Sequence, residues 1–119
     1  MENISFGKFE DGTLTVLAAG RIDASNAAEC EKTVFEILKE HPAEQVIVNA
    51  RELEYISSAG LRVIIKVKKA VKEVRITEVT PEVYDIFDMT GFTNIIKISK
   101  EFRKFSVAGC KMLGKGGCG

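Results

Sequence analysis

The stretch LEYISSAGLRVIIKVKKA, residues 53–70, joins an apolar run that ends at Ile56 to a segment with helical spacing. Two serines, Ser57 and Ser58, stand at the junction and are followed by an alanine and a glycine. From residue 58 to residue 72 apolar residues recur at intervals of three and four, with lysines between them, which is typical of a helix with one buried face. The stretch therefore predicts a strand that leads into a helix, with two hydroxyls at the helix N-terminus.

Strands and helices alternate on either side of this junction. Residues 4–20 form two alternating runs around Asp11-Gly12, a dipeptide that favours a β-hairpin. Thr80, Pro81 and Glu82 open a short helix that Gly91 ends. The expected elements after the hairpin are a helix over 23–39, a buried strand over 45–50, a helix over 58–72, a strand over 73–79, a helix over 80–91, a strand over 94–99 and a final helical turn over 99–105.

This order of elements predicts an α/β fold with a mixed sheet. The opening hairpin is antiparallel, whereas right-handed crossovers through helices make the later strands parallel. The helices then pack against the sheet. In such sheets functional loops gather where the carboxyl ends of strands meet helix N-termini. EYISSAG, residues 54–60, lies at such a place.

Length, charge and cysteine content restrict the class of protein. The 119 residues fit one domain, and 17 basic residues balance 17 acidic ones, which argues against nucleic acid or an anionic membrane as partner. No apolar run approaches the roughly 18 residues of a membrane span, and residues 1–12 show no signal-peptide pattern. Cys30, Cys110 and Cys118 have no metal-ligand spacing. We therefore expect a cytoplasmic protein without a metal, in which Cys30 is a small apolar residue of a helix.

The two hydroxyls at the junction have two possible uses. Ser57 or Ser58 can cap the helix, because the first N–H groups of a helix lack partners within it. Alternatively, one of them is phosphorylated, since a helix N-terminus tolerates an anion. A catalytic serine needs a base, and the only histidine, His41, is expected at the end of another helix. The sequence therefore predicts a protein that is not an enzyme and that binds no cofactor.

Three segments in order resemble the STAS domain, the fold of bacterial anti-sigma factor antagonists. LTVLAAGRIDASNAAECEK (14–32) resembles its second strand, its G-x-[IL]-D turn and its first helix. VIVNARELEYISSAGLRVI (46–64) resembles the signature in which a buried strand runs into D-S-S-G-L or D-S-T-G-L. VYDIFDMTGFTNIIKI (83–98) resembles an apolar helix that ends in glycine before a short strand. The resemblance predicts a STAS domain over residues 1–105.

The resemblance also implies site residues. Ser58 matches the serine that is phosphorylated in family members, and Gly60 and Leu61 match the signature glycine and leucine. Ser57 stands where the signature has aspartate and is the second candidate for phosphorylation, while Ala59 replaces the second hydroxyl. The residues that the resemblance assigns to partner binding are Asp23, Ser25, Ser57, Ser58, Ala59, Gly60, Leu61 and Arg62. From the residues alone, a second interpretation has equal weight: Asp23 or Ser25 is the N-cap of the following helix.

The function implied is a partner switch in transcription regulation. The unphosphorylated domain binds an anti-sigma factor that is also a serine kinase of the histidine-kinase-like class, which frees the sigma factor. Phosphorylation of Ser58 breaks this complex. The protein is thus predicted to be a signalling module that binds a protein partner.

The C-terminal segment SVAGCKMLGKGGCG, residues 106–119, departs from this pattern. Gly114, Gly116 and Gly119 satisfy G-x-G-x-x-G and resemble the glycine-rich loop with which a kinase-like domain covers ATP phosphates. The segment alone is too short to bind ATP, so a linker or tail is the simpler interpretation. The alternative function is an N-terminal regulatory STAS module of a longer kinase or phosphotransferase, acting by intramolecular contact or by sensing a small ligand.

Overall fold

The computed structural model describes residues 3–100, which form a mixed five-stranded sheet with the order β1-β2-β3-β4-β5. β1 pairs with β2 antiparallel, and every later neighbour is parallel. The predicted mixed α/β sheet is therefore confirmed. The strands are β1 (Ile4–Glu10), β2 (Thr13–Ile22), β3 (Gln45–Ile56), β4 (Glu73–Val79) and β5 (Lys97–Lys100).

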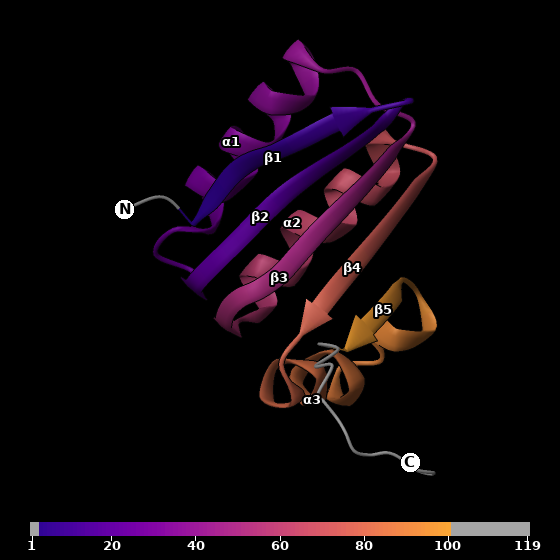
Figure 1. Ribbon diagram of the computed structural model, residues 1–119. Helices are drawn as coiled ribbons and strands as arrows, with labels where there is room; N and C mark the ends of the chain where they lie inside the picture. The colour runs from indigo at the N-terminus through magenta and orange to yellow at the C-terminus, as the bar shows by residue number, and fades with distance from the viewer. Residues whose placement is uncertain (1–2, 101–119) are drawn as a thin grey trace, which may run out of the picture.

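Three helices and one 3₁₀ turn connect the parallel strands. α1 and α2 lie next to each other behind the sheet as seen in Figure 1, and α3 lies near the carboxyl end of β4 and contacts β3. The described helical elements are α1 (Ala27–Glu40), α2 (Ser58–Ala70), α3 (Pro81–Met89) and the 3₁₀ turn η1 (Phe92–Asn94).

One hydrophobic core fills the space between the sheet and the helices. Successive residues of a strand point to opposite faces, so Leu14 and Val16 of β2 are buried whereas Leu17 is 41% exposed. α3 adds Val83 and Phe87 to the same core, and neither has exposed surface. The apolar periodicity of strands and helices thus converges on one core.

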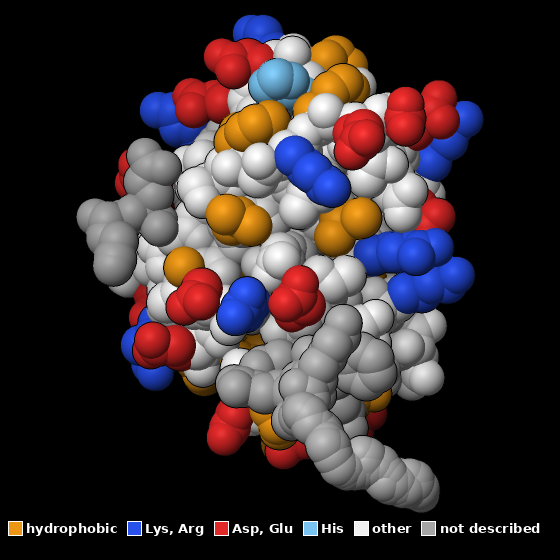
Figure 2. All heavy atoms as spheres, viewed as in Figure 1, with side chains coloured by type: hydrophobic (Ala, Val, Ile, Leu, Met, Phe, Trp, Pro, Cys, Tyr) orange, Lys and Arg blue, Asp and Glu red, His pale blue; other side chains and the backbone are white. Residues whose placement is uncertain are grey.

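The opposite face of the sheet is not covered by any described helix. Figure 2 shows this face with apolar side chains gathered around the histidine at its upper end and, below them, apolar side chains separated by charged ones of both signs. Such an interspersed pattern is ordinary for a solvated sheet face. Within residues 3–100, moreover, no helix is long and apolar enough to cross a membrane.

Local signals at two turns are confirmed. Asp11 and Gly12 have φ values of 53° and 78°, and positive φ at both central residues is what a type I′ hairpin turn requires. At α3, the Thr80 hydroxyl accepts a hydrogen bond from the backbone N–H of Val83, and Pro81 occupies the first turn. Gly91 follows with φ 80°. Both turns are therefore specified by the residues within them.

Other boundaries differ from the sequence-based prediction. β3 continues from Ala50 to Ile56, because this segment pairs with the second half of β2 and buries Leu53 and Ile56 between its charged residues. α1 begins at Ala27 instead of Asp23. Ser99 belongs to β5, so the helical turn predicted over 99–105 is wrong there, and its remainder lies outside the described residues. The segment 106–119, with Gly114, Gly116, Gly119, Cys110 and Cys118, also lies outside them.

Candidate functional site

The candidate site lies at the carboxyl ends of β2 and β3. Ile22 and Ile56 are neighbours in the parallel ladder, and the Ser57 backbone N–H donates to the Ile22 carbonyl at 2.9 Å. Asp23 follows the first of these strands and Ser58 begins the helix after the second. The fold therefore brings the loop at Asp23 next to the serine junction, although more than thirty residues separate them in sequence.

Ser57 occupies the N-cap position of α2 without capping it through its side chain. Its backbone is extended (φ −94°, ψ 177°), and its carbonyl accepts from the Leu61 N–H at 2.9 Å, the first bond of the helix. The hydroxyl makes no capping bond. Its Oγ is buried and has no hydrogen-bond partner within the described part of the chain. Ser57 is thus a cap by position only, with a hydroxyl that solvent does not reach.

Ser58 differs from Ser57 in accessibility. It is the first residue of α2 and is exposed. A kinase must reach the hydroxyl oxygen that it phosphorylates, so the two serines are not equivalent acceptors. Of the two serines, only Ser57 has its hydroxyl oxygen buried, whereas Ser58 is exposed to solvent.

The residues after Ser58 divide into two groups. Gly60 and Leu61 are buried and Ala59 is half-buried, whereas Arg62 is exposed. At Gly60 a Cβ atom would lie 2.6 Å from Ile56 Cγ1 and 2.9 Å from Ile22 Cγ2. Gly60 and Leu61 therefore anchor the start of α2 on the sheet, while Ser58 and Arg62 face solvent.

Asp23 and Ser25 form a turn of their own before α1. An Asp23 carboxylate oxygen accepts from the Ser25 hydroxyl at 2.6 Å and from the Ser25 N–H at 3.0 Å. These bonds, the hydroxyl bond first, lower the pKa of Asp23. The N-cap of α1 is Asn26, so the alternative that Asp23 or Ser25 is the cap is wrong. Both are left at the surface beside the serine junction.

Two asparagines that the sequence interpretation did not single out hold this loop in place. Asn26 accepts from the Asp23 N–H at 2.9 Å and donates to the Arg21 carbonyl at 2.9 Å. Asn3 donates to the Ala19 carbonyl at 2.8 Å. Asn26 could have been found from its type, because asparagine directly before a helical apolar pattern is a preferred N-cap residue. Asn3 has no comparable signal, since its partners are distant in sequence.

The Asp23–Ser25 turn leads to a prediction about titration. Because hydrogen bonds lower the pKa of Asp23 below the ordinary value of about 3.9, the turn contributes stability above that pH and loses it as pH falls through the folded-state pKa. Ser25→Ala removes the hydroxyl bond, so the pKa of Asp23 rises toward the ordinary value. NMR titration of the carboxyl carbon measures it, with Ser99→Ala on β5 as a control. An unchanged pKa in Ser25→Ala would contradict the assignment of these bonds.

Neither a metal cluster nor the histidine lies at this site within the described residues. No cluster of three or more His, Cys, Asp or Glu side chains suited to a metal occurs within residues 3–100. His41 ends α1, at the opposite end of the parallel strands from Ser58, and its ring stacks on Phe6 with centroids 4.7 Å apart. It does not serve either serine as a base.

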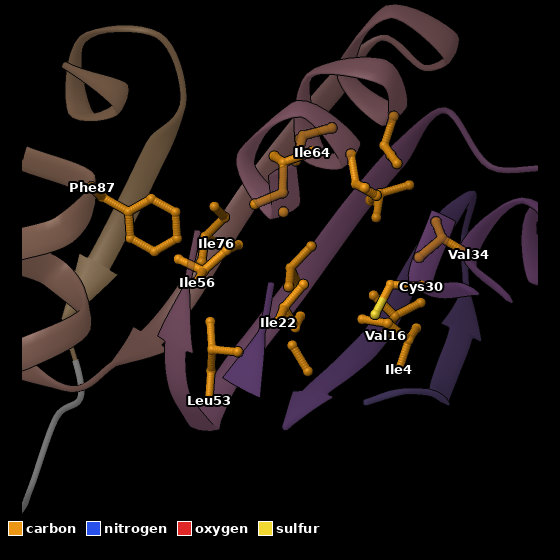
Figure 3. A pocket seen from close by; sticks show the side chains of 17 residues that line it. Ile4, Val16, Ile22, Cys30, Val34, Leu53, Ile56, Ile64, Ile76 and Phe87 are labelled. Carbon is orange, nitrogen blue, oxygen red and sulfur yellow. The ribbon is translucent and has the colours of Figure 1, made fainter. Parts of the chain in front are cut away.

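A small cavity lies inside the core between the sheet and the helices (Figure 3). Its lining is apolar, with residues such as Val16, Ile64 and Phe87, and its volume is about 40 Å³. Small-molecule sites usually measure about 300 Å³ or more, so this cavity does not support ligand sensing. Cys30 lines it, and burial raises the pKa of its thiol. The prediction of Cys30 as a buried residue in a helix is confirmed.

Comparison with known proteins identifies the family of the chain and agrees with its fold. The model of the STAS domain family matches residues 8–104, so the chain belongs to the STAS domain family. The family that the three sequence segments predicted is therefore confirmed. No curated protein matches this sequence significantly.

Solved structures share the fold at low sequence identity. An anti-sigma factor antagonist from Mycobacterium paratuberculosis is 16% identical with a TM-score of 0.69, over 81% of this chain and 85% of that one. The anti-sigma factor antagonist SpoIIAA in its unphosphorylated form is 13% identical with a TM-score of 0.67, over 82% and 89%. The phosphorylated form of the Bacillus cell fate determinant SpoIIAA is 12% identical with a TM-score of 0.59, over 82% and 92%.

Proposed function

We propose that this STAS domain is a phosphorylation-switched protein-binding module that acts as an anti-sigma factor antagonist. The observation that carries the proposal is the contrast at the start of α2, where Ser58 is exposed and the Ser57 Oγ is buried. The exposed serine adjoins the Asp23–Ser25 turn, so a partner that covers Ser58 also meets this turn. The proposed partner is an anti-sigma factor that is also a serine kinase.

The start of α2 suits the addition of a phosphate. The helix has no acidic residue in its first turn and no side-chain capping bond, so its partial positive charge is not neutralised locally. A phosphoserine adds about −1.5 to −2 charges there, which the helix dipole stabilises. The modification therefore leaves the domain folded while it changes the charge of the surface that the partner covers.

The charge change is sufficient to break a complex. An anion that is desolvated at an interface costs free energy unless the partner supplies a matching charge. Ser58 is unphosphorylated in the binding state and phosphorylated in the released state. The proposal is supported by SpoIIAA, an anti-sigma factor antagonist of the same fold whose structure was solved in an unphosphorylated and in a phosphorylated form.

The proposal extends to the organisation of the chain. We assign residues 1–105 to the STAS domain and residues 106–119 to a linker or tail. The domain acts by binding and carries out no chemistry of its own, since the only histidine lies at the opposite end of the sheet from the serines. It works in the cytoplasm, where its kinase partner has ATP.

The experiment that tests the proposal combines the purified chain with ATP and the purified histidine-kinase-like ATPases of its own cell. Mass spectrometry then maps the phosphate, which we expect on Ser58. Ser58→Ala abolishes the modification, whereas the matched variant Ser57→Ala keeps it. Phosphate on Ser57 would overturn the assignment of the site. Tight binding of a kinase without any modification would replace the switch with constitutive binding.

A further inference from the structure

The solvent face of α2 carries charge of one sign. Ser58, Arg62, Lys66 and Lys69 follow one another at spacings of four, four and three residues, which places them on one side of a helix. All four are exposed. We call Arg62, Lys66 and Lys69 the basic stripe; it starts one turn from Ser58 and ends about 16 Å from it along the helix axis.

The basic stripe is not neutralised by its own helix. α2 contains four basic residues and no acidic residue, whereas the neighbouring α1 contains four glutamates and two lysines. Lys66 pairs with Glu31 of α1, with 3.1 Å between Nζ and the carboxylate oxygen. Arg62 and Lys69 form no ion pair within residues 3–100. Arg62 and Lys69 are thus unpaired cations, one before and one after the paired Lys66, on the surface that continues from Ser58.

We infer that the basic stripe docks against an acidic surface of the protein that binds Ser58, an inference that rests on the proposed function. Complementary charge explains why α2 carries cations without acids on a protein whose net charge is zero. Nucleic acid fits the stripe less well, because its affinity comes largely from neutralised phosphates and only three cations stand here, one of them paired with Glu31. An anionic membrane is disfavoured as well, because the zero net charge of the chain gives no overall attraction to an anionic surface.

The stripe also explains how the switch would act. Long side chains of a helix lean toward its N-terminus, and Arg62 lies one turn after Ser58 on the same face, so its guanidinium can reach a group attached to Ser58. A phosphate on Ser58 then does two things. It repels the acidic surface of the partner, and it pairs with Arg62, so that Arg62 no longer contributes to binding. Attraction is thereby converted into repulsion at one end of the stripe.

The test uses the kinase that phosphorylates Ser58 in the experiment above, without ATP, and measures its Kd for the unphosphorylated chain. Arg62→Glu and Lys69→Glu each weaken binding by on the order of 10-fold at low salt. Binding of the wild type weakens as salt rises, and this salt dependence is smaller in the two variants. The matched control is Lys32→Glu on the exposed side of α1, which leaves Kd unchanged. Circular dichroism and thermal melts confirm that each variant is folded.

The outcomes separate this inference from the proposed function. If Ser58 is phosphorylated and the kinase binds, but both stripe variants bind like the wild type, the basic stripe is not the docking surface and the phosphorylation switch stands. If a 20-base-pair DNA duplex or phosphatidylserine vesicles bind the chain more tightly than the kinase does, and Arg62→Glu removes that binding, the stripe serves a different partner. If no kinase binds or modifies the chain, both proposals fail.

Discussion

Ser58→Asp weakens binding to the kinase partner by on the order of 100-fold, which corresponds to about 2.7 kcal/mol. The physical reason is that a carboxylate at this exposed position places a fixed negative charge inside the interface, opposite a surface that we infer to be acidic. Like charges brought together at an interface cost several kcal/mol. Since a carboxylate carries less charge than a phosphoserine, the phosphorylated protein binds more weakly still. Isothermal titration calorimetry with the unphosphorylated variant measures the effect.

The matched control for this prediction is Ser58→Asn. Asparagine has nearly the shape of aspartate without its charge, so binding remains within a few-fold of the wild type. If asparagine weakens binding as much as aspartate does, bulk and not charge decides the interaction, and the electrostatic account of the switch is wrong. Rising salt should also reduce the difference between the aspartate and asparagine variants, because salt screens charge at an exposed site.

Gly60→Ala destabilises the fold by about 1–3 kcal/mol, a typical cost of overpacking a core. In an exposed helix the same change stabilises by about 1 kcal/mol, because alanine is the better helix former. Here the new Cβ would approach the branched side chains of Ile56 and Ile22 to 2.6 Å and 2.9 Å. Both side chains are buried, and the close approach is relieved only if they shift toward the small core cavity that they line together with Gly60. Urea denaturation measures the change in the free energy of unfolding.

The control for the glycine uses the contact itself. In an Ile56→Ala background the atom nearest the new Cβ is gone, so Gly60→Ala costs less than it does in the wild type. A Gly60→Ala protein that is more stable than the wild type would show that the start of α2 is not packed tightly on β2 and β3. The two predictions are connected, because the same close packing holds Ser58 at the position where a partner meets it.

The sequence alone predicted those features that depend on short-range chemistry. Asp11-Gly12 specified the hairpin because positive φ is accessible to these residues, and Thr80-Pro81 specified the start of α3 through a cap and a preset φ. Periodicity predicted α2 to within two residues at its end. Three ordered segments resembled the STAS family, which the match over residues 8–104 confirms. Ser58 was selected over Ser57 by this resemblance and by no local rule.

The roles of neighbouring residues depended on contacts between distant parts of the chain. The extension of β3 to Ile56 was missed, because its charged residues suggest a loop until pairing with β2 is seen. Asn26, and not Asp23 or Ser25, proved to be the N-cap of α1. Asn26 was identifiable by type, but it is the cap by position only, since its side chain makes no capping bond and donates instead to the Arg21 carbonyl at the end of β2.

What the sequence by itself determined is the order of strands and helices and the family, because periodicity, capping and turn residues act within a few positions of each other. The tertiary structure alone decided which hydroxyl is accessible. Ser57 and Ser58 are chemically identical neighbours, and only the packing of α2 on β2 and β3 buries the Ser57 Oγ and leaves Ser58 in solvent. It also set Asp23 beside them through the bond from Ser57 to Ile22. Burial is a property of the whole packed chain, so no short stretch of sequence specifies it.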